Sequence, residues 1–259
     1  MSSAFDAVSF LAGSSNRVAV LEALASSPMR RDDLLTRIDA SRVACQRILT
    51  ELEERGWVER EGAEYAATAT GKTIAREFDQ FLDTVRVTDR LGDVMEWLPT
   101  ETFGFDIGRF ADARVTLPTD GPYIAPIARV DELVRAASES KILAPGISAS
   151  TIGANRDAVV ESGQDFEIVL PEAAIAFIKA DPGLSETFDE IIEAESVTVY
   201  VTTKSPPEMM VALLDGTTVL GLLGDSLPRG VIESEDEAVC QWARETFETW
   251  RADAMTVKN

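Results

Sequence analysis

The residues with the most specific chemistry lie together between positions 41 and 47. Arg42 and Arg47 carry guanidinium groups that can bond guanine O6 and N7, and the amide of Gln46 can pair with adenine N6 and N7. The side chains between them, Val43 and Ala44, are small enough to let a helix approach a base pair closely. The pattern predicts a helix that reads base edges in the major groove of DNA.

Four further residues suit contacts with DNA phosphates. Ser41 precedes the N-terminus of that helix, where backbone N–H groups favour an anion, and Arg30 and Arg31 open the preceding helix. Arg60 is expected on a following hairpin, near a minor groove. The alternative interpretation is that these arginines only solvate an exposed face and pair with neighbouring acids, namely Asp32, Glu51 and Glu54.

Composition excludes much other chemistry. The chain of 259 residues contains no histidine, which excludes a Ser-His-Asp triad, a Cys-His dyad and an HExxH zinc site. Its two cysteines, Cys45 and Cys240, form no CxxC pair and indicate a reducing compartment. A Gly-Lys-Thr run at 71–73 resembles the end of a P-loop, but the glycine required upstream is Ala66. We therefore expect neither an enzyme nor a cofactor, since no motif supports a hydrolase built on carboxylates alone.

Charge is distributed unevenly along the chain. The sequence has 24 basic and 45 acidic side chains, a net charge of −21. Residues 1–72 hold nine basic and eleven acidic side chains, which permits a basic face, whereas residues 73–259 hold fifteen and thirty-four. Arginines outnumber lysines by nineteen to five, as in proteins of salt-loving archaea, although an acidic mesophilic protein is the alternative. This charge predicts few phosphate contacts and DNA binding that requires a dimer.

The elements that must position these residues follow from periodicity and turn signals. Ser15 and Ser41 are predicted N-caps, Gly56 ends the third helix, and a glycine turn separates two short strands. Three helices followed by a hairpin predict a winged helix-turn-helix DNA-binding domain at residues 1–70. In order, the predicted elements are helices at 16–25, 31–38 and 41–55 and strands at 57–60 and 65–68.

The run at 41–58 resembles the recognition helix and wing entry of archaeal and bacterial winged-helix regulators. Their usual form is Ser-Arg, a small residue and an apolar residue, then Leu-x-x-Leu-Glu-x-x-Gly-aliphatic-Val. Tyr65, Thr68 and Gly71 resemble the return strand and the T-x-x-G that opens the next helix. The resemblance covers residues 15–75. It implies a protein whose partner is the double-stranded DNA of a promoter operator.

A long amphipathic helix is predicted at 71–98, interrupted only by Gly92 and ended by Pro99. Its apolar residues could pack on the C-terminal domain or against the same helix of a second copy. Winged-helix proteins often dimerise through such a helix, and the two arrangements are compatible. The segment is therefore expected to connect the domains and to form a homodimer.

Residues 99–259 are predicted to form an α/β domain with a mixed sheet, because strands alternate with helices. An Asp-Gly pair at 215–216 predicts a type I′ turn, and the run 234–237 predicts a capping box that opens the last helix. The predicted strands lie at 114–117, 141–144, 165–170, 196–202, 209–214 and 217–222, and the helices at 128–138, 149–162, 172–179, 184–193 and from about 235 to 254.

The layout of this domain, together with the stretch at 239–247, resembles the C-terminal domain of FilR1-type archaeal regulators. It is also similar in layout to the sugar-sensing regulators of the TrmB type. The resemblance implies an effector-sensing or oligomerisation domain. Related sensors share a phospholipase-D-like fold, but that activity needs HxK pairs and this chain has no histidine.

Three residues are candidates for binding a small-molecule effector. Ligand sites in α/β sheets lie at the carboxyl ends of strands. Arg129 and Lys204 could hold an anion there, and Tyr123 could stack on a sugar or base. Each also has an ordinary structural explanation, since a cation can be solvated and a tyrosine can pack.

The sequence thus predicts a cytoplasmic, homodimeric transcriptional regulator of mixed α+β and α/β fold. It consists of an N-terminal winged helix-turn-helix, a long connecting helix and a C-terminal α/β sensor domain. No run of 18 apolar residues lacks a charge and the N-terminus has no basic region, so neither a membrane partner nor a signal peptide is expected. The alternative is a winged-helix protein–protein interaction or assembly factor without specific DNA binding.

Overall fold

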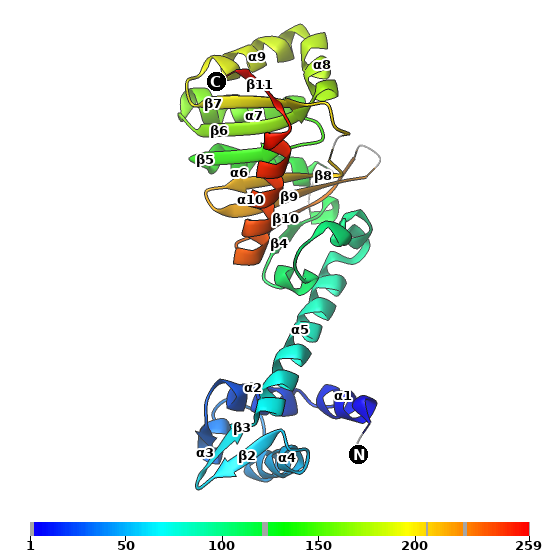
Figure 1. Ribbon diagram of the computed structural model, residues 1–259, viewed down its shortest axis with the longest axis vertical. Helices are drawn as coiled ribbons and strands as arrows, with labels where there is room; N and C mark the ends of the chain where they lie inside the picture. Colours follow the sequence, from blue (N-terminus) through cyan, green and yellow to red (C-terminus); the bar gives the residue numbers. More distant parts are fainter. Residues whose placement is uncertain (1–2, 121–123, 206, 225–226, 259) are drawn as a thin grey trace. The chain divides into compact units, whose positions relative to one another are not determined.

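The computed structural model describes residues 3–120, 124–205, 207–224 and 227–258 (Figure 1). The chain forms two compact units, Met1–Asp83 and Thr84–Asn259, and the boundary falls within α5 (Ala69–Leu91). Each unit has its own buried apolar side chains and is described separately. The predicted fold class is confirmed: a helix-turn-helix unit precedes an α/β unit with a mixed sheet.

Unit 1 combines four short helices with a three-stranded antiparallel sheet of order β1-β3-β2. Strands β2 and β3 form the predicted hairpin. The elements are α1 (Ala4–Ala12), α2 (Ser15–Ser26), β1 (Met29–Arg30), α3 (Arg31–Leu34), α4 (Arg42–Glu54), β2 (Val58–Glu61), β3 (Glu64–Ala67) and the first part of α5.

Helix α4 has the limits and the inward face that its sequence predicts. Ser41 is the N-cap, and its Oγ accepts a hydrogen bond from Ala44 N at 3.2 Å. Gly56, at φ +71°, follows the helix in a left-handed conformation that suits glycine. The apolar residues spaced three or four apart are buried and fill the core of unit 1, namely Cys45, Ile48, Leu49 and Leu52.

Unit 1 differs from the prediction at four places. The N-cap of α2 is Ser14 rather than Ser15, and α3 ends at Leu34, after which hydrogen-bonded turns replace the expected second turn of helix. The pattern also does not reveal α1, where Phe10 and Leu11 are buried. Strand β1 has only two residues, and so short a strand shows no alternation in the sequence.

The T-x-x-G run has a direct structural explanation. Thr68 Oγ1 donates to Gly56 O at 2.8 Å and accepts from Gly71 N at 3.1 Å, so one hydroxyl joins the end of α4 to the start of α5. A Cβ at position 71 would lie 1.9 Å from the carbonyl oxygen of Trp57. Only glycine fits this close approach of the backbone.

Unit 2 is built on an eight-stranded mixed sheet of order β11-β7-β6-β5-β8-β9-β10-β4. Strands β5, β6 and β7 are parallel, and β8 pairs antiparallel with β5. The strands are β4 (Arg114–Thr116), β5 (Glu139–Leu143), β6 (Asp165–Pro171), β7 (Val197–Thr202), β8 (Met209–Leu214), β9 (Thr217–Gly224), β10 (Leu227–Ser234) and β11 (Met255–Lys258).

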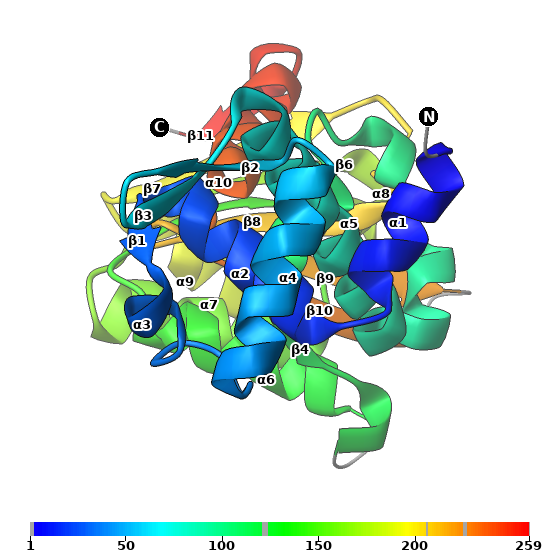
Figure 2. The ribbon, with the colours of Figure 1, turned by 90° about the horizontal axis from the view of Figure 1, so that it is seen from below.

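Helices cover both faces of this sheet. In Figure 2, α10 lies on one side of the strands and α6, α7 and α9 lie on the other. Side chains alternate along each strand, so Ile142 and Ile168 pack with α6–α9, whereas their neighbours Leu143 and Val169 pack with α10 and the segment after α5. The helices are α6 (Ala125–Ala136), α7 (Ala149–Arg156), α8 (Glu172–Ala180), α9 (Pro182–Glu193) and α10 (Glu237–Ala252), with a π-helical turn, η5 (Asp157–Glu161), and 3₁₀ turns η1 (Gly92–Trp97), η2 (Thr100–Thr102), η3 (Ile107–Phe110) and η4 (Pro118–Asp120).

Several predicted boundaries in unit 2 are wrong for identifiable reasons. Helix α5 ends at Leu91 because Gly92 adopts φ +48°, and the next turn is 3₁₀. The N-cap of α10 is Asp236, whose Oδ1 accepts from two backbone N–H groups. Ser234 instead ends β10, a strand that the sequence does not reveal, as it does not reveal β11. The predicted turn at 215–216 is confirmed, with both residues at positive φ.

Candidate nucleic-acid interface

One face of α4 is open to solvent. Val43 is 81% exposed, and the side chains of Arg42 and Arg47 are 67% and 70% exposed. On the opposite face Cys45 and Leu49 are fully buried. The helix is therefore held by one side only, and the N-terminal half of its other side is available to enter a groove.

Gln46 is oriented by the helix before it. Arg31 Nη1 donates to Gln46 Oε1 at 3.2 Å, and Arg31 Nε lies 3.8 Å from Asp32. A guanidinium only donates, so the carbonyl end of the amide faces Arg31 and its NH₂ end is left for an acceptor such as adenine N7. Arg31, predicted to bind a phosphate, thus also joins α3 to α4.

The two exposed arginines of α4 are paired with acids of the same unit. Arg42 Nη2 lies 3.5 Å from Asp32, and Arg47 Nε lies 3.8 Å from Glu51. Glu51 is already bonded to Arg17 at 3.2 Å. Exposed ion pairs contribute about 0–1 kcal/mol, so base edges or phosphates can replace these partners at little cost.

The other predicted phosphate contacts lie on the sheet of unit 1. Arg30 lies 3.9 Å from Glu64. Arg60 donates to Gly62 O at 2.9 Å, and its guanidinium lies 5.5 Å from the centre of the Tyr65 ring. Both arginines are exposed, and the hairpin that carries Arg60 also carries three acidic residues, Glu59, Glu61 and Glu64.

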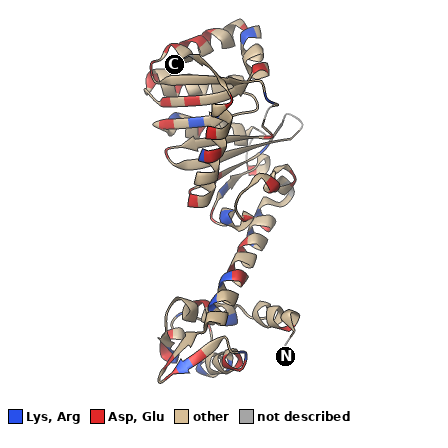
Figure 3. Ribbon diagram, viewed as in Figure 1, with Lys and Arg blue, Asp and Glu red and all other residues tan. Residues whose placement is uncertain are grey.

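The structure gathers most of the predicted base-reading residues around one shallow depression. Thr50 also borders it and was not among the predicted contacts; its Oγ1 donates to Gln46 O at 3.1 Å, and its place one turn after Gln46 is the signal that could have found it. Basic and acidic residues are interspersed along the chain of unit 1 (Figure 3). The depression is lined by Arg31, Arg42, Val43, Gln46, Arg47, Thr50, Glu51 and Glu54.

The predicted effector residues are not brought together. Arg129 donates two bonds to Glu233, at 2.7 and 2.8 Å, and one to Glu132, which raises the pKa of its guanidinium and occupies its donors. Lys204 pairs with Asp253 beside the end of β7. Glu233, which holds Arg129, is on β10, and four strands separate β10 from β7, a distance on the order of 20 Å. Arg129 and Lys204 therefore do not form the expected anion site. Tyr123 lies outside the described residues.

In the described parts of the chain, no three Cys, Asp or Glu side chains are grouped so that they could hold a metal ion. No helix among the described residues is both long and apolar enough to cross a bilayer. The fold defines the class as two-unit proteins in which a helix-turn-helix unit is joined to an α/β unit.

Comparison with protein families places the chain within this class. Residues 123–253, more than half of the chain, match the middle domain of the methanogenesis regulatory protein FilR1. Residues 5–90 match the HVO_A0261 N-terminal domain. The chain belongs to the archaeal FilR1-type regulators. No curated protein sequence matches it.

Solved structures resemble the chain only distantly. TrmBL2, described as an archaeal chromatin protein with a novel mode of DNA binding, is 13% identical; the match covers 96% of this chain and 98% of that one, with a TM-score of 0.39. Nuc from Salmonella typhimurium, a phospholipase D family member, is 12% identical over 57% of this chain and 98% of its own, with a TM-score of 0.45. NucT from Helicobacter pylori is 13% identical over 55% and 97%, with a TM-score of 0.41.

Proposed function

We propose that the chain is a DNA-binding transcriptional regulator that reads a promoter operator with α4 and the hairpin at 58–67. The observation that carries the proposal is the division of α4 into two faces. Its apolar face is buried in the core, while Arg42, Val43 and Arg47 are exposed near its N-terminus. These residue types, in this part of a helix, suit base edges in the major groove.

The proposal includes a homodimer. Two recognition helices must stand about 34 Å apart to enter successive major grooves, and a single copy offers few phosphate contacts. Helix α5 exposes Phe81 and Val85, at 56% and 39%, which supplies apolar surface for a second copy. Unit 2 would then modulate binding, because a ligand or altered assembly there changes the spacing of the two helices.

The acidic composition sets the conditions for binding. Arg30, Arg42 and Arg47 have intramolecular acidic partners, and Glu51 and Glu54 border the C-terminal half of α4. Phosphates would be repelled there, so DNA contacts are confined to the N-terminal half of α4 and to the hairpin. We expect the regulator to work in the cytoplasm of a salt-loving archaeon, where salt screens its net charge of −21.

The alternative function is binding to a protein partner, and the exposure of Val43 supports it. Genome-wide immunoprecipitation of the tagged protein at native salt separates the two. Discrete promoter peaks that share an inverted repeat, and that vanish in an Arg42→Ala/Arg47→Ala variant of equal abundance, would establish a dimeric regulator. An absence of peaks with soluble protein present would reject DNA reading and favour the partner-binding function.

A further inference from the structure

A pocket of about 510 Å³ lies in unit 2 where β5 ends. It is enclosed by the sheet on one side and by α6 and α7 on the other. This volume falls in the range of small-molecule sites. Most of its lining is aliphatic, including Val130, Val134, Ile142, Ile168, Met210 and Val231.

One buried polar atom in the lining has no partner. Asn155 on α7 is 1% exposed, and its Oδ1 accepts no hydrogen bond from any described residue. The other buried amide near these helices, Gln164, is satisfied, since it donates to Val134 O and Ala137 O and accepts from Ser140 Oγ. Buried polar groups are nearly always paired, so the unpartnered and almost fully covered Oδ1 of this lining residue lacks a donor, which a ligand could supply after a small rotation of the amide.

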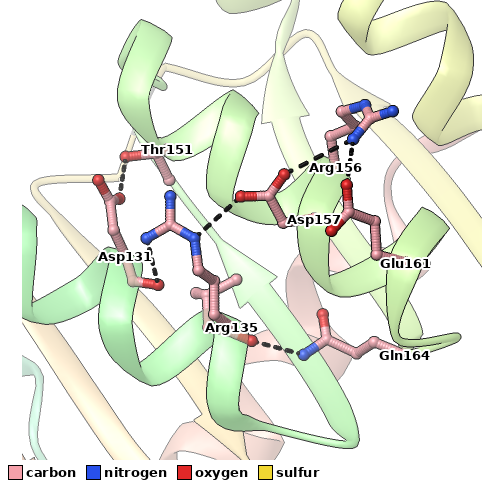
Figure 4. A network of polar contacts seen from close by, with 8 residues as sticks. Asp131, Arg135, Thr151, Arg156, Asp157, Glu161 and Gln164 are labelled. Carbon is pink, nitrogen blue, oxygen red and sulfur yellow. Dashed lines mark hydrogen bonds and ion pairs between the residues drawn. The ribbon is translucent and has the colours of Figure 1, made fainter.

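The helices that cover the pocket are fixed to each other before any ligand arrives. Thr151 Oγ1 on α7 donates to the buried carboxylate of Asp131 on α6 at 2.9 Å. Arg135 on α6 bonds Asp157 just after α7 at 3.1 Å, and Gln164 bonds the end of α6 (Figure 4). The cavity is therefore preformed rather than a gap between loosely packed helices.

The charge of the lining restricts the ligand. Glu208, an exposed residue, is the one charged side chain among the described residues that line the pocket. With no lysine or arginine in this lining, an anion would lose its hydration without gaining a partner. An apolar molecule with a hydroxyl or N–H group would instead bury its carbon skeleton and satisfy Asn155.

We infer that this pocket binds a neutral or cationic, mainly apolar small molecule whose hydrogen-bond donor reaches Asn155 Oδ1. That such a molecule acts as the effector of the regulator rests on the function proposed above. Only one strand lies between the pocket and the turn that follows α5. Gly230 of β10 lines the pocket, and β10 packs against η1, since a Cβ at position 230 would lie 3.4 Å from Val94 Cγ1. Displacement of β10 by a ligand would therefore press on that turn.

The test uses the full chain at native salt and N-phenyl-1-naphthylamine, a neutral aromatic probe with a single N–H donor. Its fluorescence should report one saturable site per chain. 1-Decanol should displace the probe, whereas decanoate, which has the same chain length but is anionic, should not. A lack of saturable binding, or equal displacement by decanoate, would overturn the inference.

Three variants locate the site. Asn155→Leu removes the acceptor without adding charge and should weaken probe binding about tenfold while leaving the fold intact. Gly146→Leu places a side chain on the pocket wall and should also weaken it. Gly153→Leu is the matched control: a new Cβ at either glycine meets nothing within 4 Å, but Gly153 does not line the pocket. Circular dichroism checks folding.

Probe binding by these variants tests the pocket alone and does not depend on DNA binding. Wild-type affinity in both Asn155→Leu and Gly146→Leu would overturn the inference, whereas loss in both with a normal Gly153→Leu would support it. Because the titration contains no DNA, its failure would leave the proposed regulator standing. Failure of the immunoprecipitation would in turn leave the pocket standing.

Discussion

Replacing Arg47 with alanine separates DNA reading from folding. Arg47 is 70% exposed, and its acidic partner Glu51 keeps a second partner, Arg17, at 3.2 Å. An exposed ion pair of this kind contributes about 0–1 kcal/mol, and alanine favours the helix. The free energy of unfolding should therefore change by less than about 0.5 kcal/mol.

The effect on DNA binding should be much larger. A bidentate contact to guanine distinguishes the correct base by about 1–3 kcal/mol, which is about 5–150-fold in affinity. The loss should appear for the operator but not for a duplex in which the contacted G·C pair has already been replaced. A phosphate contact would instead weaken binding to every duplex alike.

The assay is fluorescence anisotropy of labelled operator duplexes at fixed native salt, with urea unfolding alongside. Arg244→Ala is the matched control, because it removes the same charge from an exposed position in unit 2. It should bind within about twofold of wild type. Normal operator binding by Arg47→Ala would refute the assigned register of α4, and a drop in stability above about 1 kcal/mol would refute the account of its ion pair.

Three further predictions concern the scaffold. Gly71→Ala should destabilise unit 1 by about 3 kcal/mol, because the new Cβ would meet Trp57 O. Gly153→Ala should stabilise unit 2 by about 0.5–1 kcal/mol, because alanine favours a helix and its Cβ meets nothing within 4 Å. Equal denaturation midpoints for the two variants would contradict this prediction. If the chain forms the proposed homodimer, Phe81→Glu should convert it to a monomer in light scattering, and an unchanged mass would remove this part of α5 from the proposed interface. Burial raises the pKa of the Cys45 thiol, so the stability that the protonated thiol gives the folded state is complete below the pKa of the unfolded chain and is lost as the pH rises. From about pH 8 to about pH 10, the wild type should therefore lose more free energy of unfolding than Cys45→Ala. Equal losses in the two proteins would contradict the raised pKa.

The parts of the fold that the sequence predicts are those governed by near neighbours. The limits of α4 follow from Ser41, Gly56 and an apolar period of three to four, and the turn at 215–216 follows from its Asp-Gly pair. The capping box predicted at 234–237 was wrong because Ser234 is equally compatible with a helix N-cap and with the end of a strand. Only its pairing with Thr218 of β9 decides between the two. Strands β10 and β11 lack alternation clear enough to be recognised alone.

The sequence predicts which face of α4 is exposed, but it does not predict the contacts that the charged side chains of this face make. A helical period of 3.6 places Arg42, Val43 and Arg47 on the face opposite the core, whatever surrounds the helix. The partnership of Arg31 with Gln46 depends on the angle at which α3 meets α4, which no periodicity encodes.

The sequence by itself therefore determined the kind of protein: a charged, histidine-free regulator with a helix suited to base edges. Tertiary structure alone decided which charged side chains have an intramolecular partner and where a cavity remains. Arg129 is bonded to Glu233, 104 residues away, and the strand order keeps it far from Lys204. The unpartnered Oδ1 of Asn155 and the pocket that α6, α7 and five strands line are features of the packed structure alone. The reason is physical, since periodicity reports the geometry of one segment, whereas burial and pairing depend on which distant segments pack against it.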